Sequence, residues 1–264
     1  MMIAGYFGAL VMGVSLGLLG GGGSIFAVPI LYYLFGLGMA EATSYSLFLV
    51  GFTSGIGALS YIKKRLVFFK AILQFGLPSI VGVFLTRQIL WPILPTTFFK
   101  IGDFELTRDL AMLILFAMLM LVASYKMIRP KRPKPKSEVD DNSMLKLVVQ
   151  GLLVGGITGL MGVGGGFLII PALVILLGLE MKLAIGTSLV LIALNSFSGF
   201  LFSLKGVQID WKFLAYFSVC SIVGVLLGSF FNKKIEGSKI KPAFGVFVFL
   251  MGVYVLVKEL LVLI

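Results

Sequence analysis

The chain has 264 residues, of which 59% are hydrophobic and 12% are charged, and its mean hydropathy is +1.10. This composition excludes a soluble globular protein, which would need far more polar surface at this length. The formal charge of +11 comes from 22 Lys and Arg residues that lie almost wholly between apolar runs, as the positive-inside rule requires. We therefore predict a multi-pass protein of the cell (inner) membrane that contacts the lipid bilayer and has no nucleic-acid partner.

The side chains that most catalysis and metal binding need are scarce. The chain has no His, and Cys220 is its only cysteine, which excludes an internal disulfide, His catalysis and a thiolate metal site. We also assign the acidic residues almost wholly to loops, and so expect no buried proton relay or cation site. The sequence thus predicts a protein that is not an enzyme and uses no cofactor and no metal.

Taken in order, the apolar runs are of two kinds. Two stretches, 2–36 and 144–178, are each interrupted near the middle by glycines, which leaves arms of about 17 and 12 residues. The shorter arm reaches only about 18 Å as a helix, less than the hydrocarbon thickness, so each stretch is either one broken helix or a hairpin. The other runs predict six full crossings, at 43–62, 67–88, 109–128, 185–204, 212–232 and 243–262.

The distribution of the basic residues distinguishes the broken helix from the hairpin. When the basic segment between the apolar halves is placed in the cytoplasm, 16 of the 22 Lys and Arg residues fall on that side. Segment 144–178 must then enter and leave from one face, which makes it a hairpin. By repeat symmetry, 2–36 is also a hairpin but opens to the outside, and both termini are external.

The repeat itself is explicit in the letters. GLLGGGGSIFAVPIL at 17–31 returns as GLMGVGGGFLIIPAL at 159–173, an offset of 142 residues that continues without a gap through most of each half. We predict an all-α polytopic membrane protein with two inverted-topology repeats, 1–128 and 144–264, joined by a basic cytoplasmic linker at 129–143. Each repeat is a Gly-broken, re-entrant-like hairpin followed by three transmembrane helices, a plan typical of secondary transporters.

The glycine runs Gly20–Gly23 and Gly164–Gly166 predict unwound chain, because each glycine weakens a helix by about 1 kcal/mol. Unwound backbone before a helix leaves free N–H groups at the positive end of its dipole, a geometry that attracts anions. Ser24 would cap the first of these helices through its hydroxyl. Isolated glycines such as Gly13 and Gly17 are better explained by close helix packing.

Polar residues on the crossing after each hairpin are the other candidates. They serve either as hydrogen bonds between helices or as neutral donors to an anion, and the sequence leaves both open. The predicted substrate-binding residues are Gly21, Gly22, Gly23, Ser24, Ser46, Ser54, Gly164, Gly165, Gly166, Thr187, Ser188 and Asn195.

The two motif copies resemble those of the TauE/SafE sulfite-exporter family over nearly the whole chain. The resemblance implies transport, usually outward, of small anions such as sulfite, sulfoacetate or other organosulfonates. It puts the binding role on Gly21–Ser24 and Gly164–Gly166. Here Val163 replaces a glycine and Gly166 replaces the serine, so the second copy is less polar. Related thiosulfate importers rely on reactive cysteines, and Cys220 lies far from both glycine runs.

We therefore expect a transporter of small anions that works by alternating access around a mid-membrane site. Two alternatives belong to other classes: a membrane-embedded enzyme acting on lipid, and a non-transporting membrane subunit in which the glycines only pack. The sequence also leaves open whether the protein forms a homodimer.

Overall fold

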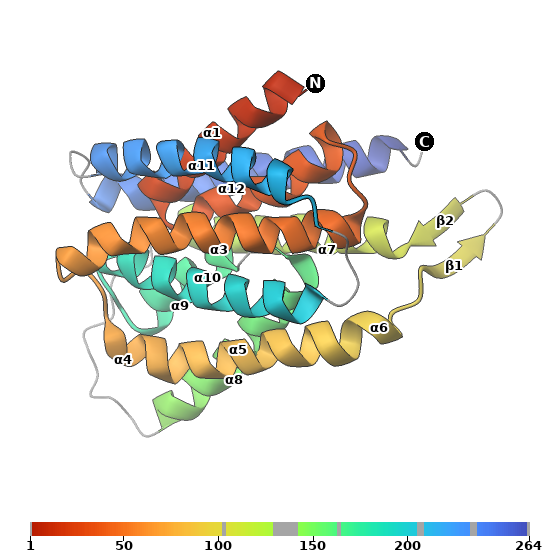
Figure 1. Cartoon of the computed structure of the whole chain (residues 1–264). Coiled ribbons are helices and arrows are strands. Elements are labelled where there is room, and N and C mark those ends of the chain that lie inside the picture. The colour runs from red at the N-terminus through yellow and green to blue at the C-terminus, as the bar shows by residue number, and fades with distance from the viewer. Residues whose placement is uncertain are drawn as a thin grey trace.

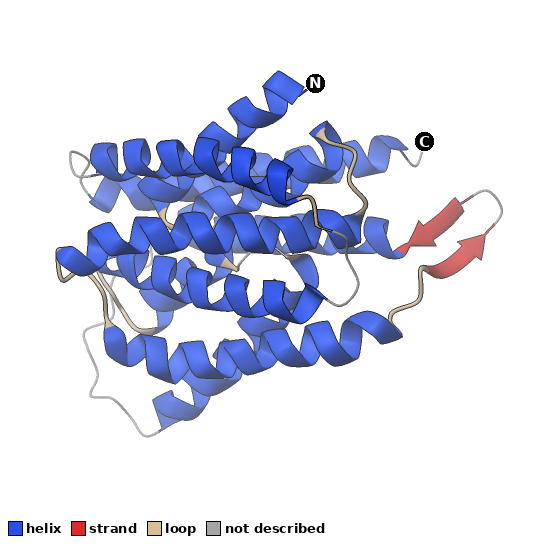
Figure 2. Ribbon diagram, in the orientation of Figure 1, coloured by secondary structure: helices blue, strands red, loops and turns tan. Residues whose placement is uncertain are grey.

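The computed structural model describes residues 2–101, 104–128, 142–162, 165–204, 209–232 and 237–262. The described chain is a bundle of long helices that run side by side, with one small two-stranded hairpin projecting from one end (Figures 1 and 2). The predicted linker 129–143 lies outside the described residues except for its last two positions.

The first half is helical up to the hairpin and after it. Its elements are α1 (Met2–Leu19), the 3₁₀ helix η1 (Gly21–Phe26), α2 (Ala27–Pro29), the π-helical η2 (Ile30–Leu34), α3 (Met39–Lys63), α4 (Phe69–Ala71), the π-helical η3 (Ile72–Gly76), α5 (Leu77–Leu85), the π-helical η4 (Thr86–Leu90), α6 (Trp91–Ile93), β1 (Thr97–Ile101), β2 (Phe104–Thr107) and α7 (Arg108–Ile128).

The second half repeats this order with simpler helices. Its elements are α8 (Asn142–Met161), α9 (Gly166–Leu176), α10 (Met181–Ser203), α11 (Trp211–Asn232) and α12 (Gly237–Val262).

Five of the six predicted crossings are confirmed as helices long and apolar enough to span a membrane. They are Met39–Lys63, Phe69–Ile93, Arg108–Tyr125, Met181–Ser203 and Trp211–Asn232. The sixth predicted crossing, 243–262, lies within the continuous helix α12 and stays a prediction.

The helix from Phe69 to Ile93 is longer than predicted and contains two π-helical stretches. Pro78 and Pro92 each follow one of them by two residues. Proline has no N–H to bond the carbonyl four residues earlier, here those of Gln74 and Gln88, so the helix widens at these places.

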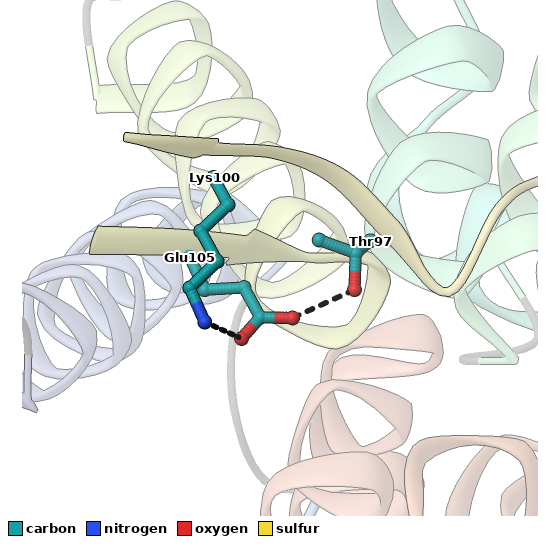
Figure 3. Close-up of polar contacts among 3 residues, drawn as sticks. All are labelled: Thr97, Lys100 and Glu105. Carbon is teal, nitrogen blue, oxygen red and sulfur yellow. Dashed lines mark hydrogen bonds and ion pairs between the residues drawn. The ribbon is translucent and has the colours of Figure 1, made fainter. Parts of the chain in front are cut away.

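The segment 89–108, predicted to be a loop, instead contains the antiparallel hairpin β1–β2. The strands pair Thr97 with Thr107 and Lys100 with Glu105. Glu105 accepts a hydrogen bond from the Thr97 hydroxyl at 2.8 Å and lies 3.9 Å from the Lys100 ammonium, as Figure 3 shows. These polar groups suit a ribbon that extends beyond the helix bundle into the aqueous phase (Figure 1).

Helices α3 and α10 form the centre of the bundle and pack against each other. Around them, α1 packs on α11, α5 packs on α8, and α7 packs on α12. An offset of 142 residues relates α1 to α8 and α11 to the helix containing α5. The contact of α1 with α11 is therefore equivalent to the contact of α8 with α5, and both join the first half to the second. The outward faces carry large exposed apolar side chains such as Phe84, Leu201 and Leu226, as a lipid-facing surface should.

Glycines allow these helix pairs to approach closely, as predicted for Gly13. A Cβ on Gly13 would lie 2.1 Å from the Ser221 carbonyl oxygen, and one on Gly155 would lie 1.9 Å from that of Ser79. The two glycines and the two serines are each 142 residues apart. The same small-residue contact therefore joins α1 to α11 and α8 to α5.

The chain folds back after α1. The start of α1 lies beside the end of the next arm, since a Cβ on Gly5 would meet the Phe35 ring and one on Gly8 would meet Ile30. In the second half, α8 and α9 also contact each other. Figure 1 shows the labelled N and C ends at the end of the bundle that carries the β-hairpin, with the α3–α4 turn at the opposite end.

Candidate functional site

The two glycine breaks meet through their backbones. A Cβ on Gly21 would lie 2.2 Å from the carbonyl carbon of Gly166, and one on Gly166 would lie 2.3 Å from the Cα of Gly21. Gly166 is the first residue of α9, and Gly21 is the first residue of η1. The starts of two helices, one from each half, therefore touch where neither residue has a side chain.

The unwound region is smaller than predicted in the first half. Only Gly20 leaves the helical conformation there, with φ 69° and ψ −111°, while Gly21, Gly22 and Gly23 already belong to η1. In the second half Gly162 and Gly165 have positive φ of 67° and 68°, and Gly164 lies outside the described residues. Positive φ is a conformation that glycine adopts at little cost.

The predicted capping role of Ser24 is wrong. Gly20 is the residue that precedes η1, and it makes no side-chain cap. Ser24 is fully buried and donates its hydroxyl to the Gly21 carbonyl oxygen at 2.7 Å. Because the 3₁₀ turn begins at Gly21, four residues earlier than a cap at Ser24 requires, the hydroxyl closes that turn instead of accepting from the helix start.

One face of α10 lines the meeting point. Ser188 lies beside the first break, since a Cβ on Gly20 would be 3.1 Å from its Oγ, and Ile192 lies beside the second, 2.7 Å from a Cβ on Gly166. Ser196 is one helical turn further along the same face, where α10 approaches Gly51 of α3. A stripe of Ser188, Ile192 and Ser196 therefore runs from the breaks to the contact of α10 with α3.

The offset of 142 places an equivalent stripe, Ser46, Val50 and Ser54, on α3. The hydroxyls of Ser46, Ser54 and Ser196 are fully buried and have no hydrogen-bond partner among the described residues. The buried hydroxyl of Thr53 also has no hydrogen-bond partner among the described residues. Buried hydroxyls nearly always have a partner, and a helical serine can usually bond the preceding turn. These groups are therefore free to donate to a ligand.

Two other predicted residues make hydrogen bonds between elements. Thr187 donates to the Leu183 carbonyl at 2.7 Å and accepts from the Phe68 N–H at 2.9 Å, so its hydroxyl ties α10 to the chain before α4. Asn195 donates from Nδ2 to the Ser79 hydroxyl at 2.6 Å, while its Oδ1 has no partner among the described residues.

Ser188 is engaged locally, because its hydroxyl donates to the Ile185 carbonyl at 2.8 Å. Thr187 and Asn195 thus form hydrogen bonds between elements, one of the two roles that the sequence left open. The side-chain carbonyl oxygen of Asn195 has no partner among the described residues.

A small apolar pocket lies beside the breaks, between α2, α3, α7 and α8. It has no room for a water molecule, so the side chains are closely packed here. The residues that line it are Val28, Met39, Met112, Leu113, Phe116 and Met161.

The sequence interpretation missed one buried acid. Glu259 near the end of α12 is only 6% exposed and accepts a hydrogen bond from the Tyr33 hydroxyl. The ammonium of Lys258 lies 3.4 Å from the centroid of the same tyrosine ring. The expectation that acidic residues keep to loops therefore fails at this position. A carboxylate inside the long apolar run that ends the chain was the available signal.

Comparisons with known proteins agree with this architecture. Residues 6–255 match the family model described as Sulfite exporter TauE/SafE. A "Probable membrane transporter protein" of Xylella fastidiosa (strain Temecula1) is 30% identical over 93% of this chain and 91% of its own length. The "Probable membrane transporter protein YunE" of Bacillus subtilis (strain 168) is 25% identical over 92% of this chain and 93% of its own. No solved structure matches the chain at a significant level. The family model covers nearly the whole sequence, and the chain therefore belongs to the TauE/SafE family of membrane transporters.

Proposed function

We propose that this protein exports a small anion, such as sulfite or a short organosulfonate, through a site where the two glycine breaks meet. The observation that carries the proposal is the backbone contact of Gly21 with Gly166, which lies against Ile192 of α10. The buried hydroxyl of Ser196, one turn further along the same face of α10, and its equivalent Ser54 on α3 have no partner among the described residues. Family membership supports a transport role.

The chemistry of this arrangement favours an oxyanion. The first N–H groups of a helix have no partner within it, and the dipole there is positive. Two such helix starts face each other, and serine hydroxyls can add neutral donors. A sulfite or sulfonate group presents three oxygens that can accept from several directions at once. The wall residue Ile192 would contact the apolar part of an organosulfonate.

For transport, elements of the two repeats have to move against each other around the site. We propose that 1–128 and 144–264 are inverted-topology repeats and that access alternates around the Gly21–Gly166 contact. The equivalent packing of α1 on α11 and of α8 on α5 gives two similar helix pairs that can exchange roles.

Serine substitutions in reconstituted vesicles test this proposal. Ser196→Ala and Ser54→Ala should each slow sulfite efflux about tenfold, the loss of one hydrogen bond of about 1.4 kcal/mol. Their melting temperature should not fall, because these hydroxyls make no hydrogen bond to any residue that the structure describes. Ser198→Ala is the matched control, since its exposed hydroxyl bonds only the Leu194 carbonyl of its own helix.

Equal transport rates in all three variants and the wild type would show that the hydroxyls of Ser54 and Ser196 do not bind the anion. Absence of transport of sulfite, methanesulfonate and sulfoacetate by the wild-type protein would reject the function itself.

A further inference from the structure

A second cluster of charge lies away from the glycine breaks, on the two helices that flank the β-hairpin. Arg87 of η4 and Arg108, the first residue of α7, both approach the indole ring of Trp91 in α6. Their guanidinium carbons lie 5.0 and 4.9 Å from the ring centroid. Two positive charges thus share one aromatic ring, a contact that uses the flat faces of the guanidinium groups and not their N–H donors.

Three guanidinium nitrogens of this cluster have no acceptor among the described residues. Arg87 is only 6% exposed, and its Nε and Nη2 have no hydrogen-bond partner among the described residues, nor does Nε of Arg108. The ion pair found in the described part of the chain joins Lys100 to Glu105, so no described carboxylate lies within ion-pair distance of either arginine. A buried guanidinium normally requires an anion and full hydrogen bonding.

Helix packing does not account for the charge. The residue equivalent to Arg87 in the second half is Ser229, and the residue equivalent to Arg108 is Leu250. The equivalent helix pairs therefore form with neutral residues at both positions. The neighbour of Arg87, Thr86, packs against Gly159, three residues before the second break begins at Gly162. The cluster is thus connected to the helix that leads to the breaks.

We propose that Arg87 and Arg108 bind an oxyanion beside Trp91. The ligand is a group with several equivalent oxygens and a delocalised charge, because a planar guanidinium recognises such groups with two parallel N–H bonds. A free sulfonate and the phosphodiester of an anionic lipid share this chemistry. If the ligand is free, the site is a second station for the exported anion at the hairpin end of the bundle, and that part rests on the proposed function.

Tryptophan fluorescence tests the site directly, because Trp91 and Trp211 are the chain's two tryptophans. The Trp211→Phe protein in phosphatidylcholine nanodiscs would be titrated with methanesulfonate against chloride at constant ionic strength. We expect a saturable change in Trp91 emission. Arg87→Met or Arg108→Met should weaken the apparent affinity at least tenfold, and Arg87→Lys should have an intermediate effect, since it keeps the charge but loses the fork.

Two results would overturn the proposal. One is a saturable response that both Met variants retain, and the other is a response that is absent in every lipid. Melting temperature serves as the folding control, because replacing a buried unpaired charge by Met should not destabilise the protein.

Lipid composition separates the two sources of oxyanion. In phosphatidylglycerol nanodiscs, a lipid ligand would shift Trp91 emission without methanesulfonate, Arg87→Met would remove that shift, and added methanesulfonate would have little effect. A free-anion site would respond alike in both lipids. Sulfite efflux by Arg87→Met distinguishes this proposal from the export proposal: a response at Trp91 in a protein that transports no anion would leave the site standing and reject only its place on an export path.

Discussion

The two glycine breaks are copies of one sequence, yet they differ where they touch. The first break contains Ser24, and its equivalent in the second is Gly166. Gly166 lies against Gly21, and any side chain there would overlap backbone atoms at 2.3 Å. Ser24 has room for its hydroxyl, which closes the turn begun at Gly21. The difference that made the second copy look less polar is therefore a steric consequence of the contact between the halves.

Contacts within equivalent helix pairs behave differently. Gly13 and Gly155 face Ser221 and Ser79 in the same way, so the duplicated sequence keeps its packing where the two pairs do not meet. Duplication thus preserves the repeated helix contacts. At the Gly21–Gly166 interface, in contrast, the two copies carry different residues and different polar groups. The following substitutions separate these two kinds of position.

Reciprocal swaps at the break give the largest expected effect. Gly166→Ser makes the second copy match the first, but its Cβ meets Gly21 backbone, so we expect transport to be lost and stability to fall by about 3 kcal/mol. Ser24→Gly makes the first copy match the second and removes one hydrogen bond, with a cost of about 1 kcal/mol. Transport assays and melting temperatures of the two variants measure the difference. Similar behaviour of both would mean that the halves are interchangeable here.

Gly155→Ala tests the repeated packing. A methyl group 1.9 Å from the Ser79 carbonyl oxygen must push α8 from α5, at a cost of about 2 kcal/mol. Gly55→Ala in α3 is the control, because the nearest atom to its new Cβ is 3.9 Å away and the helix gains up to about 1 kcal/mol in propensity. The two changes should move the melting temperature in opposite directions. A fall of equal size in both would show that α8 and α5 do not pack this closely.

The sequence predicted what depends on local pattern. Apolar run length located five spans, and the 142-residue offset identified equivalent helices before any contact was known. The β-hairpin was missed although Gly102-Asp103, between its strands, is a pair that favours two-residue hairpin loops. Its strands are only 5 and 4 residues long, so their pattern is weak beside the long apolar runs of the flanking helices.

Long-range contacts explain the remaining errors at the site. Ser24 was expected to cap a helix, but the start of η1 is decided by the approach of Gly166, which is distant in sequence. The arginines around Trp91 were read as loop charges, because nothing local shows that Arg87 is buried. Ser54 was predicted from the sequence as a binding residue, whereas the lack of a hydrogen-bond partner for its hydroxyl and for that of Ser196 needed coordinates.

The bond from Tyr33 to Glu259 joins the two halves and is not repeated, since the residues equivalent to Tyr33 and Glu259 are the apolar Ile175 and Ala117. Tyr33→Phe leaves a buried carboxylate without its donor and should cost about 1.5 kcal/mol. Tyr33→Phe combined with Glu259→Leu should recover most of that loss, because both partners are then apolar. Tyr254→Phe, at an exposed position of α12, is the control. A double variant less stable than Tyr33→Phe would show that the carboxylate has another role.

The smallest effect is expected at Asn195, whose amide donates to Ser79 at 2.6 Å. The pair equivalent to it by the 142-residue offset is Thr53 with Ser221, and Ser221 bonds its own helix at the Phe217 carbonyl instead. A double-mutant cycle with Asn195→Ala and Ser79→Ala should give a coupling of about 0.6 kcal/mol, as is usual between membrane helices. Thr53→Ala with Ser221→Ala is the matched cycle and should give no coupling. Equal couplings in the two cycles would mean that this polar contact is repeated after all, and that the halves differ at the centre only in the glycines.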